Sequence, residues 1–315
     1  MACLPLAHIS WAIADNERRK ACDAWLIDTF GAETAYEMLI TPESEAMGFD
    51  REEKLLLVGD TMLIPIAPAG SGLSPESGTG EMLRRSAGPN RWLGLALKVA
   101  DIAEAAAWFE GRGFRLHYDP GMESIYFLIG RGQALGVRLE LLCQQLPNDP
   151  REQSGWNPMR WRDDHPLGIE GLQSIGVSVP TLESARALFA DRLELPELGG
   201  RSLPGEDAEC LAFDLGDTVI EALCPTDPAS AIAAHVRDVK GICCITFKVR
   251  SVETAAAYLE GKGFDLIGDV ATRFAIHPDQ AFGQLIWLTG NAVAGYPPLG
   301  SKLGEPARFG ATLTL

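Results

Sequence analysis

Two segments that we expect to be strands carry side chains capable of acid–base chemistry. His8 lies in AHISWAIA (7–14), where apolar residues alternate with small or polar ones, and Glu140 lies in VRLELL (137–142), two residues after Arg138. Strand side chains alternate between faces, so Arg138 and Glu140 share one face. Histidine serves as a general base or a metal ligand, and arginine can hold a substrate carboxylate through two hydrogen bonds. We expect these three side chains to face one cavity.

Each of these residues also has a structural interpretation. His8 can be a hydrogen-bonded histidine of a strand. Glu140 can be one half of an ion pair with Arg138 or Lys98, because a buried carboxylate needs a partner. Lys98 lies on the small-residue face of the strand expected over 93–100, and we predict that it binds substrate.

The second half of the chain offers fewer reactive groups. Glu221 lies in a strand expected over 218–223 and is interpreted either as a lone catalytic base or as a satisfied structural carboxylate. Trp287 faces the same predicted cavity, where it fills space or stacks on a flat substrate. Cys243 and Cys244 are adjacent, so alternation places them on opposite faces, and ordinary burial is the expected role.

The elements that position these residues repeat along the chain. AAAWFEGRGF (105–114) returns as AAAYLEGKGF (255–264), and GDT occurs at 59–61 and 216–218. Such repetition indicates a duplicated architecture. Hydrophobic periodicity predicts four βαβββ modules, an α+β fold, with helices expected over 16–30, from Asp101 to 111–113, and over 182–193 and 252–261. Pro68–Pro89 is rich in Gly, Ser and Pro and predicts a mobile linker, and 144–168 is the expected domain boundary.

Composition limits the classes of function. The 315 residues carry a formal net charge of −16, which argues against nucleic acids and anionic membrane surfaces as partners. Seven scattered cysteines without a C-x-x-C motif indicate a reduced, cytoplasmic protein. The N-terminus does not resemble a signal peptide, and no segment has the length and apolarity of a membrane helix. We therefore expect a small-molecule substrate and a monomer or homodimer.

Four βαβββ modules in two pairs resemble the vicinal oxygen chelate superfamily, which includes glyoxalase I, methylmalonyl-CoA epimerase and several dioxygenases. The resemblance is most specific over 218–288, where TVIEALCP, VKGICCITFKV and AIHPDQAFGQLIWL are similar to a methylmalonyl-CoA epimerase domain. It implies two tandem domains. Their expected bounds are 1–150 (modules 5–68 and 92–144) and 166–292 (modules 170–225 and 240–290), followed by a tail over 293–315.

The resemblance also implies one divalent metal (Zn²⁺, Fe²⁺, Mn²⁺, Co²⁺ or Ni²⁺), bound in a cavity of this fold. In the first domain, His8 and Glu140 match two ligand positions, whereas Gly94 and Ile64 stand where further ligands are expected. In the second domain, Ser174, Cys244 and Trp287 replace the usual His, His and Glu. A metal normally needs about three protein ligands. Chemistry without a metal is therefore favoured, and dioxygenase chemistry is disfavoured.

Three hypotheses about function follow. The chain is a metal-assisted enzyme of the isomerase, epimerase or lyase type, a metal-free enzyme that transfers protons with His8 or Glu140, or a non-catalytic binder of small molecules. The preferred one is an enzyme acting on a small carbonyl-bearing or aromatic metabolite in the first domain. Pairing of modules one with two, and three with four, is the simpler expectation. If modules two and three paired instead, Glu140 and Glu221 would become neighbours.

Overall fold

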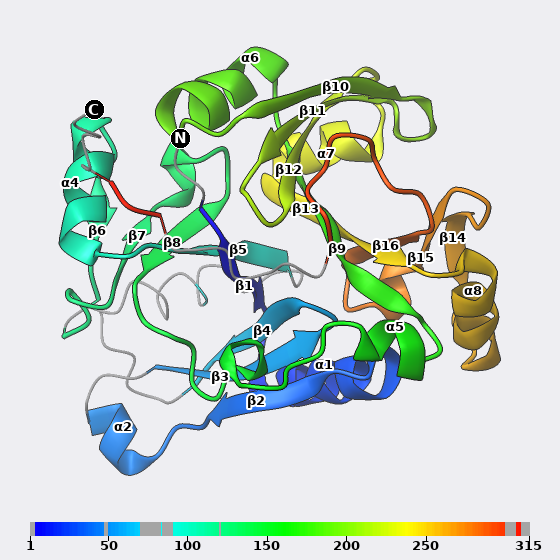
Figure 1. Ribbon diagram of the computed structural model, residues 1–315, viewed down its shortest axis with the longest axis horizontal. Coiled ribbons are helices and arrows are strands. Elements are labelled where there is room, and N and C mark those ends of the chain that lie inside the picture. The colour runs from blue at the N-terminus through cyan, green and yellow to red at the C-terminus, as the bar shows by residue number, and fades with distance from the viewer. Residues whose placement is uncertain are drawn as a thin grey trace.

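The computed structural model describes residues 4–46, 50–69, 83, 91–119, 121–299 and 307–309. Most of the linker predicted over Pro68–Pro89 lies outside these ranges. The described chain forms two eight-stranded sheets, one from each half of the sequence, with the helices at the periphery (Figure 1). Each sheet is assembled from two βαβββ modules.

The first sheet has the strand order β2-β3-β4-β1-β5-β8-β7-β6. Its central strands, β1 and β5, are antiparallel, and each pairs in parallel with the last strand of its own module, β4 or β8. The bounds are β1 Leu6–Ala12, β2 Glu33–Met38, β3 Arg51–Val58, β4 Thr61–Pro68, β5 Arg91–Lys98, β6 Leu116–His117, β7 Tyr126–Ile129 and β8 Arg138–Leu142.

The second sheet repeats this order as β10-β11-β12-β9-β13-β16-β15-β14. Modules one and two therefore share one sheet and modules three and four the other, so Glu140 and Glu221 lie in different sheets. The bounds are β9 Ile169–Ser178, β10 Glu197–Leu203, β11 Ala208–Asp214, β12 Val219–Pro225, β13 Gly241–Val249, β14 Leu266–Asp269, β15 Arg273–Ile276 and β16 Leu285–Thr289.

Most helices begin and end where local chemistry predicts. The Asp15 side chain caps α1 (Asn16–Phe30), which ends at the left-handed Gly31. Asp101 caps α4 and Ser251 caps α8 in the same way. The remaining helical bounds are α2 Pro42–Ala46, α4 Ile102–Gly111, α5 Arg160–Asp164, α7 Ala231–Asp238, α8 Val252–Gly261 and the short 3₁₀ turns η1 Arg131–Gln133, η2 Pro150–Glu152, η4 Pro204–Glu206 and η5 Pro278–Gln280.

The helix expected over 182–193 differs from the prediction. Only α6 (Leu182–Ala185) is α-helical, and η3 (Arg186–Arg192) is a π-helix. After this segment the Leu193 amide donates to the carbonyl of Leu188, five residues earlier. The Arg192 guanidinium lies 3.7 Å from the centre of the Phe114 ring, which belongs to the other half of the chain. The periodicity found a helix but could not distinguish this wider turn.

One hydrophobic core joins the two sheets. A continuous cluster of buried side chains includes Trp11 of β1, Trp92 of β5 and Ile175 of β9. Trp11 and Trp92 lie 4.8 Å apart between ring centres, and Phe282, which precedes β16, meets Trp11 edge-on at 6.3 Å. The halves therefore share apolar packing of the kind found within a single domain.

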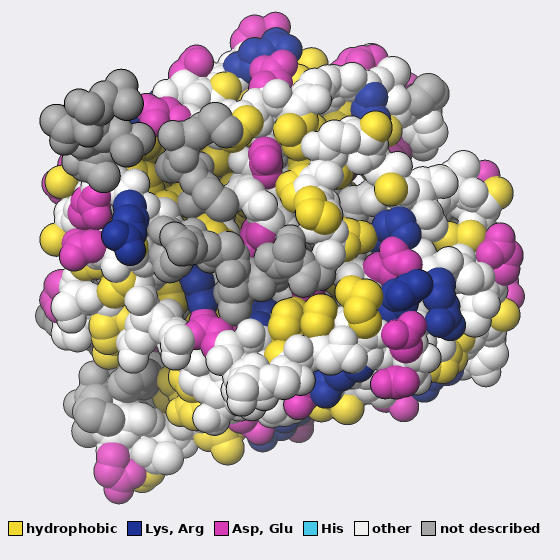
Figure 2. All heavy atoms as spheres, in the orientation of Figure 1, with side chains coloured by type: hydrophobic (Ala, Val, Ile, Leu, Met, Phe, Trp, Pro, Cys, Tyr) yellow, Lys and Arg dark blue, Asp and Glu magenta, His cyan; other side chains and the backbone are white. Residues whose placement is uncertain are grey.

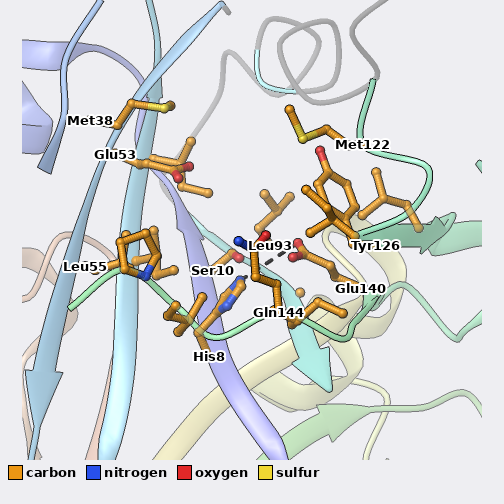
Figure 3. Close-up of a pocket in the computed structure, with 18 of the residues that line it drawn as sticks. His8, Ser10, Met38, Glu53, Leu55, Leu93, Met122, Tyr126, Glu140 and Gln144 are labelled. Atoms are coloured by element: carbon orange, nitrogen blue, oxygen red, sulfur yellow. Dashed lines mark ion pairs between the residues drawn. The ribbon is translucent and has the colours of Figure 1, made fainter. Parts of the chain in front are cut away.

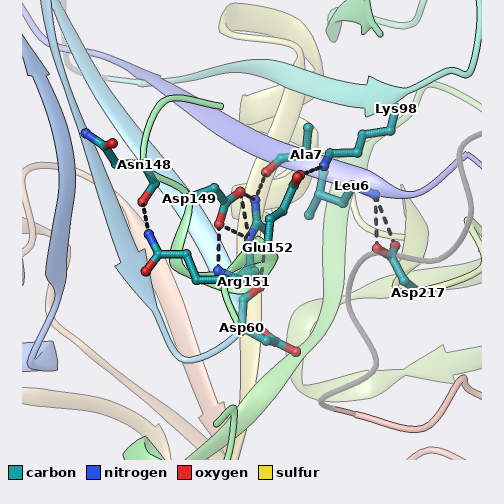
Figure 4. A network of polar contacts seen from close by, with 10 residues as sticks. Leu6, Ala7, Asp60, Lys98, Asn148, Asp149, Arg151, Glu152 and Asp217 are labelled. Atoms are coloured by element: carbon teal, nitrogen blue, oxygen red, sulfur yellow. Dashed lines mark hydrogen bonds and ion pairs between the residues drawn. The ribbon is translucent and has the colours of Figure 1, made fainter. Parts of the chain in front are cut away.

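Two buried aspartates tie each half to the first strand of the other. Asp60 accepts a hydrogen bond from the Leu172 amide of β9 at 2.9 Å. Asp217 accepts from the Leu6 amide of β1, with both carboxylate oxygens at 3.1 Å (Figure 4). Both belong to the repeated GDT motif, and both are at most 3% exposed. We call this reciprocal pair of contacts the aspartate clasp.

Removing either carboxylate of the aspartate clasp should destabilise the whole chain. Asp60→Ala and Asp217→Ala each leave a buried strand amide without an acceptor, which costs about 1–3 kcal/mol of unfolding free energy. Urea denaturation of each variant and of the double variant measures the effect. Asp191→Ala, at an exposed position, is the control and should change stability little. Wild-type stability in both clasp variants would contradict this account.

Candidate functional site

A cavity of about 280 Å³ opens in the first sheet, between the β1–β4 and β5–β8 modules. His8, Ser10, Arg138 and Glu140 line it together with apolar side chains. Figure 3 shows His8 and Glu140 pointing toward one another, with Glu53 and Leu55 on the wall formed by β3 and Tyr126 on the opposite wall. The apolar lining consists of Met38, Leu55, Ile64, Ile66, Leu93, Leu95, Met122, Ile125, Leu128, Leu142, Leu146 and Pro147.

His8 is a neutral imidazole in this cavity. Its side chain is only 7% exposed, and its Nε2 lies 3.9 Å from Oε2 of Glu140. Burial lowers the pKa of His8 to about 4; Arg151 and Arg138 also lower it, and Glu53 opposes them. Nδ1 is buried with no hydrogen-bond partner among the described residues. His8 therefore faces Glu140 without forming an ion pair at neutral pH.

Glu140 and Arg138 come from alternate positions of β8 and share a face, as expected. Burial raises the pKa of the Glu140 carboxyl, and the guanidinium groups of Arg138 and Arg51 oppose the shift. Burial also lowers the pKa of Arg138, which stays cationic. In the sheet, Ala96 of β5 pairs with His8 of β1 on one side and with Glu140 of β8 on the other. Gly94 pairs in the same way with Ser10 and Arg138. The sheet thus brings together the three residues predicted for the site.

Sequence reasoning missed several further polar residues of the cavity, among them Arg51, Glu53 and Tyr126. Arg51 and Glu53 of β3 form an ion pair at 3.2 Å, and Tyr126 of β7 donates to Asp119 at 2.7 Å. Burial raises the pKa of Tyr126, and Arg51 opposes this. Both residues lie at the start of β3, which begins at Arg51. Extending the alternation to Arg51 and Glu53, which share one face, would have found that pair.

Lys98, which was predicted to bind substrate, is not among the residues that line this cavity. Its Nζ is paired with Glu152. Lys98 is the last residue of β5 and lies next to Glu152, which belongs to the connection between the two halves of the chain (Figure 4). There Arg151 donates to the Ala7 carbonyl at 2.7 Å and binds Asp149. Alternation assigned the face of Lys98 correctly but could not tell where along the strand the cavity ends.

The residues of the first cavity do not fit a divalent metal. Of the positions matched to metal ligands, only His8 and Glu140 carry donors, and the Arg138 cation lines the same cavity. Gly94 cannot carry a ligand, because even a Cβ there would lie 2.1 Å from the Arg138 carbonyl oxygen. No group of three His, Cys, Asp or Glu side chains is placed to hold a metal anywhere in the described chain.

The second sheet encloses a larger cavity, of about 570 Å³. Glu221, predicted as a catalytic residue, lies there and is 2% exposed, with hydrogen bonds from Ser174 at 3.1 Å and from Arg201 and Tyr296. Trp287, predicted to bind substrate, also lines this cavity. The contacts of Glu221 match its structural interpretation.

Cys243 and Cys244 do not point to opposite faces, contrary to expectation. The register shifts between Ile242 and Cys244, and both thiols lie close to Gly176. A hydrogen bond with Cys244, together with burial, raises the pKa of the Cys243 thiol. A bulge adds a residue and breaks the alternation. Both side chains are buried, as the preferred interpretation required.

Comparison with known proteins identifies the architecture. A triple mutant of 4-hydroxymandelate synthase from Streptomyces coelicolor superposes over 93% of this chain and 95% of its own, with a TM-score of 0.67 and 14% sequence identity. The protein has the vicinal oxygen chelate fold. This confirms the fold expected from the βαβββ repeats, and at this identity the likeness extends to the fold alone.

Shorter proteins match part of this chain. Methylmalonyl-CoA epimerase from Mycobacterium tuberculosis covers 45% of it and 94% of its own length, with 20% identity and a TM-score of 0.37. A hypothetical protein, BH1468, from Bacillus halodurans C-125 covers 38% and 91%, with 25% identity and a TM-score of 0.35. Such scores are too low to assign a function. No protein-family model matches the sequence, and no curated protein matches it.

On the face drawn in Figure 2, Lys and Arg side chains are interspersed with Asp and Glu and do not gather into one broad basic area. None of the helices described for this chain combines the length and apolarity that spanning a bilayer requires.

The lowered pKa of His8 makes a prediction about stability. The unfolded chain takes up a proton near pH 6.5 and the folded site only near pH 4, so the contribution of His8 to stability is complete above pH 6.5 and falls as the pH drops from 6.5 toward 4. Between pH 8 and pH 5 the wild type should lose about 2 kcal/mol more unfolding free energy than His8→Asn.

Urea titrations at both pH values measure this difference. His117→Asn, at an exposed histidine, is the control and should retain the full pH dependence of the wild type. Equal pH dependence in the wild type and His8→Asn would show that His8 titrates normally.

Proposed function

We propose that the first cavity catalyses metal-independent proton transfer, of the isomerase, epimerase or lyase type, next to the carbonyl of a small metabolite. The observation that supports this most directly is the placement of a neutral imidazole 3.9 Å from a carboxylate in a cavity with apolar walls. Clefts that combine such walls with a few convergent polar groups are typical of small-molecule sites. The volume of about 280 Å³ favours a compact substrate.

Arg138 is the proposed anchor for a substrate carboxylate. Its side chain lies on the cavity face of β8, beside Glu140, and its planar guanidinium can form two parallel hydrogen bonds with a carboxylate. Apolar residues of β4 and β7 would hold the rest of the molecule. Such a substrate would carry an acid group, a carbonyl and an apolar tail.

Glu140 is the proposed base. Burial raises its pKa, which makes the carboxylate a better acceptor for a proton next to a carbonyl group. The neutral His8 would donate a hydrogen bond from Nε2 to the carbonyl oxygen, where negative charge develops as the proton leaves. Glu140 would then return the proton to carbon, leaving the enzyme unchanged.

A non-catalytic small-molecule binder is the second candidate. The ion pair of Arg51 with Glu53 and the bond from Tyr126 to Asp119 satisfy several polar groups of the cavity internally. A binder needs only the apolar walls and the Arg138 anchor, whereas an enzyme also needs Glu140 to exchange protons with its ligand.

Exchange of substrate protons with solvent distinguishes the two candidates. The full-length protein is incubated in D₂O with 2-oxobutyrate, 4-methyl-2-oxopentanoate or phenylpyruvate, and ¹H NMR follows loss of the signal next to the carbonyl. We expect exchange that Glu140→Gln slows by roughly 10²–10⁴-fold. Arg138→Leu should mainly raise the substrate concentration required for half-maximal exchange. EDTA should leave the exchange rate unchanged.

The outcomes separate the hypotheses. Exchange that EDTA abolishes would overturn the metal-independent mechanism. Binding of a 2-oxo acid, seen by saturation-transfer NMR, without exchange would favour the binder. Absence of both binding and exchange for all three acids would overturn this substrate class. Gln144→Ala, at the edge of the same cavity, is the control for general disturbance of the site.

A further inference from the structure

We propose that the second cavity is a separate binding site for a small, neutral molecule that carries a carbonyl or amide oxygen. Its volume of about 570 Å³ lies within the range of small-molecule sites. Its lining differs in chemistry from that of the first cavity. The proposal does not depend on the function proposed for the first domain.

Two hydrogen-bond donors in the lining of this cavity have no partner within the described part of the chain. The Thr246 hydroxyl is on β13, and the Trp287 indole Nε1 is on the adjacent strand β16, opposite Thr246 in the register. The two residues are 3% and 9% exposed, and neither group has a hydrogen-bond partner among the described residues. Buried donors are usually satisfied, so an unpaired neighbouring pair beside a cavity indicates a ligand that supplies an acceptor.

The charges of this cavity disfavour an anionic ligand. Arg201 is paired with Glu221 and also donates to the Tyr296 hydroxyl at 2.7 Å, and Arg273 is paired with Glu206. Both guanidinium groups in the lining are therefore already neutralised. Asp269 adds a further negative charge at the edge. An anionic ligand would find no unpaired cation among these lining residues. The Thr246 hydroxyl and the Trp287 indole N–H therefore favour a ligand with a neutral hydrogen-bond acceptor.

The indole is held in a defined position. The Arg273 guanidinium lies 4.4 Å from the centre of the Trp287 ring, and the ring packs against Gly268, where an added Cβ would lie 3.0 Å from Cζ3. Gly268 also has a φ of +90°, which disfavours any other residue. Both contacts fix the plane of the ring and with it the direction of the N–H.

Nuclear magnetic resonance of the indole N–H groups tests the site in the full-length protein. The chain has seven tryptophans, and Trp287→Phe assigns the Trp287 signal in the ¹⁵N-labelled protein. Acetamide, 2-pyrrolidone and nicotinamide, which are neutral amides of increasing size, are titrated in turn. At least one should move the Trp287 signal in a saturable way and leave the other six indoles unmoved. Nicotinate, the anionic counterpart of nicotinamide, should bind at least tenfold more weakly than nicotinamide.

Thr246→Val is the matched variant, because it keeps the shape of the side chain and removes only the hydroxyl. It should weaken amide binding roughly fivefold. Glu140→Gln should leave the response unchanged, which keeps this result independent of the first cavity. The proposal is overturned if none of the three amides moves the Trp287 signal, if nicotinate binds as well as nicotinamide, or if Thr246→Val binds like the wild type.

Discussion

The aspartate clasp is the interaction on which the relative placement of the two halves depends. Asp60 and Asp217 each accept a hydrogen bond from an amide in the first strand of the opposite half. Those strands, β1 and β9, carry His8 and Ser174. Because the carboxylates are buried, water cannot replace them as hydrogen-bond acceptors. Loss of either bond would therefore leave a buried polar group unsatisfied. The same bonds that join the halves therefore also hold one wall of each cavity.

The connection between the halves reinforces this arrangement. Arg151 binds Asp149 and donates to the backbone carbonyls of Ala7 and Asp60. It thereby links the connection to β1, next to His8, and to the turn that carries half of the aspartate clasp. Its positive charge also helps to keep His8 neutral. A segment that joins two domains in sequence is thus part of the first cavity's electrostatic environment.

The two cavities share a fold but differ in electrostatics. In the first, burial lowers the pKa of His8 and raises the pKa of Glu140, so it favours the neutral form of each side chain. In the second, Glu221 is held by Arg201, Tyr296 and Ser174, and two neutral donors that line the same cavity have no hydrogen-bond partner among the described residues. This difference is why we propose proton transfer for the first cavity and a neutral ligand for the second.

Local sequence patterns determined the secondary structure and the pairing of side chains on strand faces. Alternation placed Arg138 beside Glu140, capping residues located α1, and the repeats indicated four modules, because these features depend on neighbours a few residues apart. The same rules failed at the bulge before Cys244, where one extra residue reverses the faces.

Other features of the site were decided only by the tertiary structure. The distance between His8 and Glu140, the pairing of Lys98 with Glu152, and the contributions of Arg51 and Tyr126 all depend on which strands become neighbours in the sheet. The sequence marked Asp60 and Asp217 as a repeat but did not show that each reaches across to the other half. Charge, burial and hydrogen bonding act through space, so residues far apart in the chain set the chemistry of each cavity.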